Sequence, residues 1–149
     1  MVELDSGLTL RALLKPGEFS KAIPFIEMFL ARSEGESSVE TIRDNVFNNR
    51  YQCWFIEDGD EVVSVCITKI DEWISYKSLH ILGLGALPGH WESFRDAHKW
   101  LEEWAKEIGC DRMSVWTNRA WLRLFQKVDF TGINGEKYEE KYKVLHMKL

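Results

Sequence analysis

Histidines and one glycine-rich turn are the parts of this 149-residue chain whose residue types are best suited to chemistry. His80 falls inside the run from Ser78 to Leu84, which is typical of a β-strand. A neutral imidazole can accept a proton near pH 7, so His80 is a candidate general base. The alternative is a structural histidine on a half-buried strand. Glu57 and Asp71, on neighbouring segments, are two further candidates for the base.

The other three histidines are placed less well for proton transfer. His90 and His98 flank a predicted helix, and His98 falls on or beside its apolar side, which indicates a structural role. His146 is opposite in phase to the core residues of the last predicted strand, which indicates an exposed side chain. The sequence has no G-x-S-x-G elbow, P-loop, H-E-x-x-H helix or Rossmann fingerprint.

The glycine-rich turn runs from Gly83 to Gly89 and precedes a predicted helix of residues 91–108. A helix start offers unpaired N–H groups and partial positive charge, and glycine lets the backbone approach a ligand, so phosphate could bind here. Pro88 removes one donor, and Glu92 puts a carboxylate where phosphate charge would go, although Arg95 would compensate. The alternative is an ordinary strand-to-helix turn in which Glu92 stabilises the helix dipole.

Hydrophobic periodicity predicts one domain over residues 1–149. The expected strands span residues 8–14, 51–57, 61–70, 78–84 and 112–116, with a last hairpin of 130–133 and 138–149. The expected helices span residues 19–32, 37–48, 91–108 and 118–129. In the first, Pro24 fits best in a first turn, so the regular helix is expected to start near Ala22. The second is capped by Ser37 and Glu40. This order predicts an α/β (α+β) fold with a mixed, mostly antiparallel sheet of six to seven strands and helices on both faces.

Charge and hydropathy exclude several classes of partner. The net charge of −5 argues against general binding of nucleic acid and mildly favours a cationic substrate such as an amine. No apolar run approaches the ~18 residues that span a bilayer, and the acidic N-terminus does not resemble a signal peptide. We therefore expect a cytoplasmic protein without a membrane partner.

The cysteines and tryptophans leave two questions open. Cys53, Cys66 and Cys110 lack the spacing of a zinc site or a disulfide framework, so no metal is expected. Cys53 and Cys66 could face each other across a hairpin, where a disulfide is conceivable, although reduced thiols are expected in a reducing compartment. The seven tryptophans fit either a core of large rings or an aromatic-lined groove.

Residues 118–130 resemble the closing segment of the GCN5-related N-acetyltransferase (GNAT) family, N-x-x-A-x-x-L-Y-x-K-x-G-F. The matching residues are Asn118, Ala120, Leu124, Lys127 and Phe130. Phe125 and Asp129 stand where the family has tyrosine and glycine. The order of strands and helices is similar to the GNAT order along nearly the whole chain. The resemblance implies a three-layer sandwich in which acetyl-coenzyme A (acetyl-CoA) lies between two strands that part, residues 78–84 and 112–116.

The resemblance also implies a function, namely an N-acetyltransferase that uses acetyl-CoA as co-substrate and acts on a small-molecule or protein amine. It places five residues along the pyrophosphate and pantetheine path: Leu84, Gly85, Ala86, Gly89 and His90. Asn118 would hold the cofactor arm, Phe125 would pack on it, and His80 would be the base.

The chain departs from the family at two points. The family's phosphate motif, [Q/R]-x-x-G-x-[G/A], is absent, and Phe125 has no hydroxyl with which to protonate a departing thiolate. The alternative is therefore a catalytically degenerate GNAT scaffold that serves as a binding or structural protein, similar to small aromatic-rich members encoded by bacteriophages. The exposed last strand leaves pairing with a second copy, as a homodimer, open.

Overall fold

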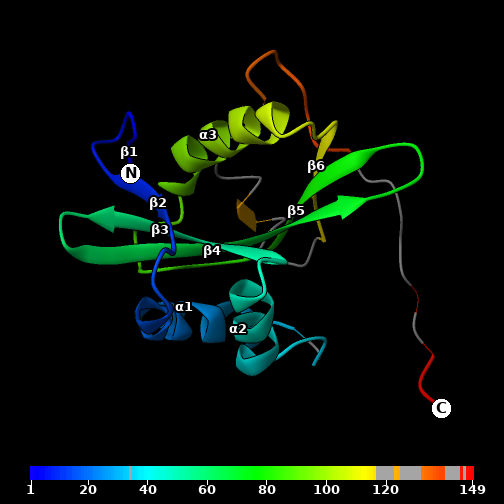
Figure 1. The fold of residues 1–149 in the computed structure, drawn as a ribbon, viewed down its shortest axis with the longest axis horizontal. Coiled ribbons are helices and arrows are strands. Elements are labelled where there is room, and N and C mark those ends of the chain that lie inside the picture. The colour runs from blue at the N-terminus through cyan, green and yellow to red at the C-terminus, as the bar shows by residue number, and fades with distance from the viewer. Residues whose placement is uncertain (34, 117–122, 125–131, 140–144, 146) are drawn as a thin grey trace.

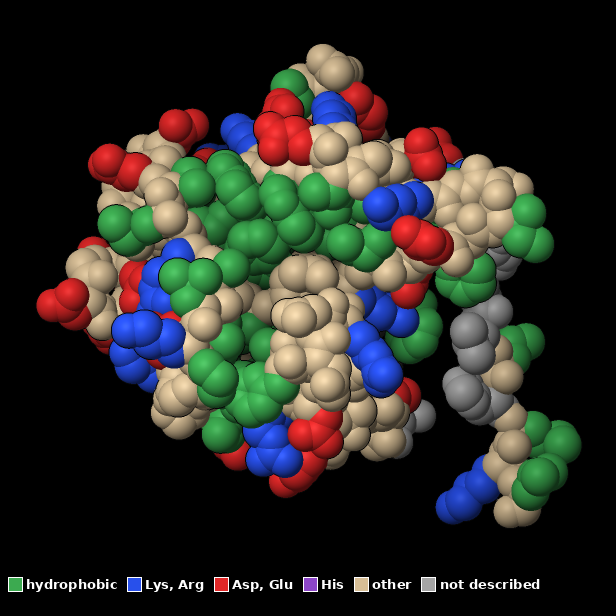
Figure 2. Space-filling view, in the orientation of Figure 1, with side chains coloured by type: hydrophobic (Ala, Val, Ile, Leu, Met, Phe, Trp, Pro, Cys, Tyr) green, Lys and Arg blue, Asp and Glu red, His purple; other side chains and the backbone are tan. Residues whose placement is uncertain are grey.

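A six-stranded sheet lies between helix α3 (Phe94–Glu107) on one face and helices α1 (Ile23–Leu30) and α2 (Val39–Phe47) on the other (Figure 1). The computed structural model describes residues 1–33, 35–116, 123–124, 132–139, 145 and 147–149. The space-filling view shows hydrophobic side chains gathered in a band between α3 and the layer of α1 and α2 (Figure 2). The predicted arrangement of helices on both faces is confirmed.

The strands follow one another across the sheet in chain order. They are β1 (Val2–Glu3), β2 (Thr9–Ala12), β3 (Tyr51–Asp58), β4 (Glu61–Glu72), β5 (Lys77–Ala86) and β6 (Arg112–Val115). All neighbours are antiparallel except β5 and β6, which are parallel because α3 carries the chain back between them. The predicted mixed, mostly antiparallel sheet is confirmed, and β1 is a strand that the sequence did not predict.

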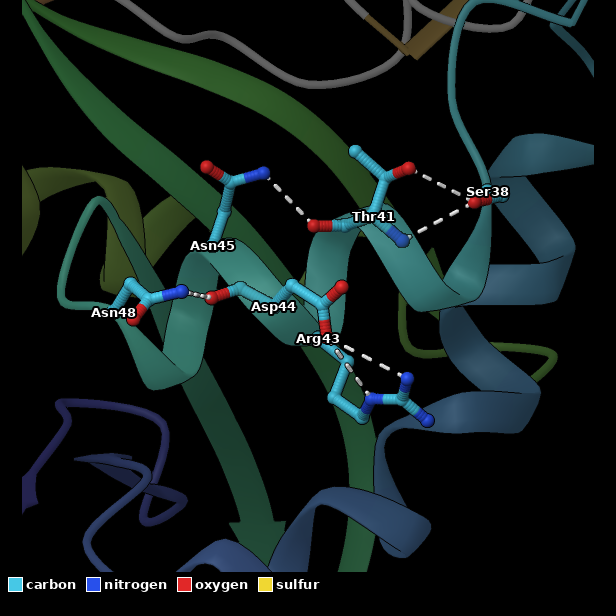
Figure 3. Close-up of polar contacts among 6 residues, drawn as sticks. All are labelled: Ser38, Thr41, Arg43, Asp44, Asn45 and Asn48. Carbon is cyan, nitrogen blue, oxygen red and sulfur yellow. Dashed lines mark hydrogen bonds and ion pairs between the residues drawn. The ribbon is translucent and has the colours of Figure 1, made fainter.

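Several predicted element boundaries are wrong by a few residues. The predicted strand 8–14 is reduced to β2. Residues before the first regular helix form a 3₁₀ helix, η1 (Pro16–Lys21), and α1 then starts at Ile23, next to the start predicted near Ala22. The cap of α2 is Ser38 rather than Ser37: its Oγ accepts a hydrogen bond from the N–H of Thr41 at 3.1 Å (Figure 3). The helix 91–108 begins at Phe94, because residues 91–93 form turns.

The C-terminal part of the chain is described only in pieces. Arg123 and Leu124 are helical, as predicted, while the remainder of residues 117–131 lies outside the described residues. A turn is confirmed at Asn134 and Gly135, closed by the N–H of Gly135 donating to the carbonyl of Gly132 at 2.9 Å. Residues 132–139 contain no strand, so that part of the predicted last hairpin is wrong. Residues 140–144 and 146 lie outside the described residues. Among the described helices, none has the length and apolar character needed to cross a bilayer.

The sheet is packed on both faces, which assigns most of the tryptophans to the core. Trp54 is buried under α3 and meets the rings of Trp100 and Trp104 edge-on, with centroids 5.4 and 5.0 Å away. Trp73 and Trp116, in contrast, are 59% and 73% exposed. Among the six tryptophans that the structure describes, Trp54 is buried, Trp91, Trp100 and Trp104 pack partly buried against the same core, and two lie at the surface.

The register of β3 against β4 excludes the conceivable disulfide. Cys53 lies opposite Ile67, and Cys66 lies opposite Trp54, one position away. Since neighbouring residues of a strand point to opposite faces, Cys53 joins the core beneath α1 and α2, and Cys66 joins the core beneath α3. All three cysteines are free and buried.

The predicted glycine-rich turn is partly strand. β5 continues two residues past Leu84, so Gly83 and Gly85 lie within it. A Cβ on Gly83 would overlap the ring of Phe29, and a Cβ on Gly85 would overlap the main chain of Phe25. These two glycines allow α1 to pack against β5. Gly83 lies in the strand, in agreement with the predicted strand 78–84, whereas Gly85, which was predicted to open the turn, is also a strand residue.

Replacing Gly85 with alanine should destabilise the protein by about 1–3 kcal/mol, because the added methyl group would meet the backbone of α1 rather than a movable side chain. Urea unfolding followed by tryptophan fluorescence measures this change. Gly17→Ala is the matched control, since a methyl group at that position would meet no other heavy atom within 4 Å and its effect should be small. Equal midpoints for the two variants would contradict the packing described for α1.

Candidate functional site

The pairing between β5 and β6 stops halfway along β5. Parallel partners run from Ser78 opposite Arg112 to Ile81 opposite Val115. β6 ends there, whereas β5 continues to Ala86. Within the described residues, therefore, residues 82–86 have no strand on that side, and we call this stretch of β5 the open edge.

An extra residue in β5 lies next to the last described pair between β5 and β6. Ile67 of β4 faces Gly83, and the next residue, Thr68, faces Ile81, so Leu82 has no counterpart in β4. Such a bulge bends its strand and increases the local twist. It lies next to the last residue pair that the structure describes between β5 and β6, at the level where the family resemblance implies that the two strands part.

The register determines which main-chain groups point to the open edge. Leu87 donates its N–H to the carbonyl of Val63 at 2.9 Å, and Ser64 Oγ donates to the carbonyl of Gly85 at 3.0 Å. Because hydrogen-bonding direction alternates along an antiparallel strand, Gly85 bonds toward β4, and Leu84 and Ala86 point the other way. Each of these two residues offers one donor and one acceptor to an extended ligand.

The residues that the family resemblance assigned to the cofactor path do not all face the open edge. Leu84 and Ala86 are 2% and 4% exposed as whole residues, so neither side chain is available to a ligand, and any contribution at the open edge would come from their main chains. Gly85 lies beneath α1 and bonds toward β4, which removes it from that edge. Asn118 and Phe125 lie outside the described residues.

In the loop between β5 and α3, only some of the backbone N–H groups bond to carbonyls of the protein. The N–H groups of His90, Ser93, Phe94 and Arg95 bond to carbonyls three residues earlier, at 3.0 to 3.3 Å. Within the described part of the chain, no hydrogen bond uses the N–H of Gly89, Trp91 or Glu92. Gly89 has φ +82° and open space where a Cβ would be, so it forms the turn that the sequence predicted there.

His90 carries an unsatisfied polar atom in this loop. Its Nδ1 is buried and has no hydrogen-bond partner among the described residues. A buried polar atom without a partner is costly, so native proteins usually pair such atoms with protein, water or a ligand. The atom therefore fits a site in which a ligand oxygen completes the hydrogen bonding.

His80 lies one residue before the last paired position of β5 and takes part in a buried polar relay. Its Nδ1 is 2.8 Å from Ser114 Oγ on β6, and Ser114 Oγ is 2.8 Å from Ser78 Oγ. The exposed ring of Trp116 meets the imidazole edge-on at a centroid distance of 5.3 Å. When Nδ1 carries the proton, it donates to Ser114, and the lone pair of Nε2 is left for another donor.

Burial lowers the pKa of His80 to about 4, with Lys69 adding to the shift and Asp71 opposing it. The imidazole is therefore neutral at pH 7, as a base must be, although the low pKa makes it a weak one. Lys69 and Asp71 form an ion pair with each other at 3.2 Å. The Asp71 carboxylate is therefore already held by a lysine, and Asp71 lies opposite Ser78 rather than at the open edge.

The remaining candidates have structural partners. Glu57 binds Arg11 at 2.6 Å, and the same guanidinium reaches Glu18 of η1 at 3.1 Å, so this cluster ties η1 to the sheet on the far side of β4. His98 is buried, and its Nε2 lies 2.6 Å from the hydroxyl of Tyr138. The structural role expected for His98 is thereby supported, and burial lowers its pKa to about 4. His146 lies outside the described residues.

Several solved structures similar to this one are acetyltransferases, at low sequence identity. An aminoglycoside acetyltransferase from an uncultured soil metagenomic sample, solved with sisomicin, has a TM-score of 0.65 at 14% identity, covering 95% of this chain and 99% of that one. The ribosomal-protein-alanine N-acetyltransferase of Brucella melitensis has a TM-score of 0.69 at 8% identity, with coverage of 95% and 99%. A predicted acetyltransferase of Clostridium acetobutylicum, solved with acetyl-CoA, has a TM-score of 0.65 at 12% identity, with coverage of 93% and 96%.

The comparison with curated protein sequences gave no match. The family comparison did: residues 21–130 match the acetyltransferase (GNAT) family. This match begins just before α1 and ends at Phe130, so it includes the bulge, the open edge and the loop before α3. Because it covers most of the chain, and because the mixed sheet agrees with it, the match shows that the chain belongs to the GNAT acetyltransferase family.

Proposed function

We propose that this protein is an acetyl-CoA-dependent N-acetyltransferase whose acceptor is an amine of a small molecule or of a protein. The observation that supports it most is the open edge after Leu82, where the main chains of Leu84 and Ala86 point away from β4. An extended arm with amide groups can bind there as a strand would. The similar structures include an aminoglycoside acetyltransferase and a protein-alanine N-acetyltransferase, which act on amines as their names state.

The residues of the loop before α3 fit the phosphate end of acetyl-CoA. The unpaired Nδ1 of His90 and the N–H groups of Gly89 and Trp91 can donate to phosphate oxygens. Asn118 and Phe125 keep the roles that the family pattern implies, holding and packing the arm. The proposal takes residues 1–149 as one domain and keeps the cytoplasmic location expected from the sequence.

His80 would act on the amine side of the reaction. The amine nitrogen attacks the thioester carbonyl carbon, the carbon–sulfur bond breaks, and the thiolate leaves with the bonding pair. Nε2 of His80 accepts the proton that the nitrogen loses, while Nδ1 is held by Ser114. Because Phe125 carries no hydroxyl, the thiolate takes its proton from water. The low pKa of His80 implies that the amine must reach the site already neutral.

Binding of acetyl-CoA is the most direct expectation. At a concentration 100-fold above its dissociation constant, the cofactor should stabilise the fold by ~2.7 kcal/mol, since only the folded state offers the site. Thermal unfolding with and without acetyl-CoA measures this, and ATP at the same concentration controls for general binding of polyanions. An unchanged midpoint at millimolar acetyl-CoA would leave the protein with the family fold but without the activity proposed here.

Loss of the Ser114 hydroxyl should lower kcat for amine acetylation about 10-fold, and His80→Ala should lower it about 100-fold or more. Ser114 only positions the imidazole, whereas His80 accepts the proton. The KM for acetyl-CoA should change little in both variants. His98→Gln, a change at a buried histidine on α3, controls for general destabilisation. A kcat in His80→Ala equal to that of the unmodified protein would exclude His80 as the base.

The neutral state of His80 should make stability depend on pH in a defined window. An unfolded histidine titrates near 6.5, and His80 and His98 in the folded protein titrate with a pKa of about 4. Between these values the unfolded chain binds protons that the folded chain does not, so stability falls as pH is lowered from about 6.5 toward 4. One such site contributes about 3 kcal/mol over the whole window.

Urea unfolding at a series of pH values tests this expectation. The variant His80→Asn should lose stability less steeply between pH 6.5 and 4, because one of the two buried imidazoles is gone. The slope above pH 7 should be the same in both proteins. Identical slopes throughout the acidic window would show that His80 is not held neutral in the folded state.

A further inference from the structure

An arginine and a tryptophan join the two helical layers next to the open edge. Arg32 follows the end of α1, and Trp91 lies in the loop before α3 and packs against the core on the opposite face of the sheet. The guanidinium carbon of Arg32 lies 4.8 Å from the centroid of the Trp91 ring, which is a cation–π contact. Because the two residues come from opposite faces, their side chains meet beyond an edge of the sheet.

The packing of α1 shows where the contact passes. Phe25 lies against Gly85 and Phe29 lies against Gly83, so α1 runs back along β5. A helix rises about 1.5 Å per residue and a strand about 3.3 Å, which places Arg32 near the level of the bulge at Leu82. β4 occupies one side of β5 at that level, so Arg32 and Trp91 meet at the other side, over the open edge.

Arg32 is an exposed cation without a carboxylate partner among the described residues. The loop that it reaches has the unpaired Nδ1 of His90 and amides without hydrogen-bond partners, but also the exposed carboxylate of Glu92. The sequence of the loop before α3 lacks the Arg or Gln of the family's phosphate motif. Trp91 thus holds Arg32 in that neighbourhood, as a positive charge additional to that of the exposed Arg95 in the first turn of α3.

We propose that Arg32 is the phosphate-binding cation of this site and that it makes the protein specific for a phosphorylated thioester over a phosphate-free one. The inference rests on the proposed function, because acetyl-CoA provides the diphosphate that the guanidinium would bind. Arginine suits this role because its planar fork can donate two hydrogen bonds to one phosphate. The stacked ring keeps the side chain near the open edge before the ligand arrives.

Binding measurements with two thioesters test the proposal. Acetyl-CoA and acetyl-pantetheine, which has no phosphate, are titrated by calorimetry into the unmodified protein, Arg32→Gln and Arg32→Lys. Arg32→Gln should weaken acetyl-CoA binding about 10- to 100-fold, as expected for a lost charge-assisted hydrogen bond, and should leave acetyl-pantetheine binding unchanged. Arg32→Lys should bind acetyl-CoA with an affinity between those of the unmodified protein and Arg32→Gln. Arg43→Gln, a change at an exposed arginine on α2, is the matched control and should bind both like the unmodified protein.

Three results would overturn the inference, and they are distinguishable. Equal acetyl-CoA affinity in Arg32→Gln and the unmodified protein would show that Arg32 binds no phosphate. An equal loss for both thioesters would show that Arg32 only holds Trp91 in place. If the unmodified protein binds neither thioester, the proposed function itself fails, and that outcome is visible before any variant is compared.

Discussion

The extra residue in β5 is the constraint on which the candidate site depends. A bulge bends its strand and increases the local twist, and at Leu82 β5 continues along β4 while its described pairing with β6 has ended at Ile81. From that point the main chains of Leu84 and Ala86 have no strand to bond on one side, within the described residues. Where two strands stay paired along their whole length, such main-chain N–H and C=O groups bond to each other, and none is left for a ligand.

The layers around the bulge hold it in place. Gly83 and Gly85 have no side chains, so α1 lies directly on β5 and fixes the strand from one face. From the other face, β5 is held by the core beneath α3, to which Leu79 and Ile81 contribute just before the bulge and Leu84 just after it. His80 points away from that core and is fixed instead by Ser114 of β6, at the last place where the two strands are paired. The proposed base and the proposed cofactor arm therefore lie on either side of the same structural break.

Much of the sheet could be predicted from the sequence because its signals are local. The alternation in residues 51–57 and 61–70 around Asp58, Gly59 and Asp60 gave β3, β4 and their turn. The end of β5 was predicted two residues too early, since Gly85 looks like a turn residue and its packing beneath α1 is not evident from the local sequence. Tertiary contact here overrides a local propensity.

The site was predictable only in part, for the same reason. Leu84, Ala86, Gly89 and His90 were placed near the correct loop and strand by resemblance, but the sequence did not show which of them bond through the main chain. The relay from His80 to Ser114 depends on a parallel register that α3 sets across 34 residues. The contact of Arg32 with Trp91 joins segments separated in the sequence by most of the sheet, and no spacing rule could reveal it.

The most direct measurement is amide hydrogen exchange along β5, resolved by residue with NMR. If the edge is open, the N–H groups of Leu84 and Ala86 exchange faster than those of Gly83 and Gly85 in the free protein, because only the glycines bond to β4. Acetyl-CoA then slows exchange at Leu84 and Ala86 selectively. Equal protection of all four amides in the free protein, with no change on adding acetyl-CoA, would contradict an open, ligand-binding edge.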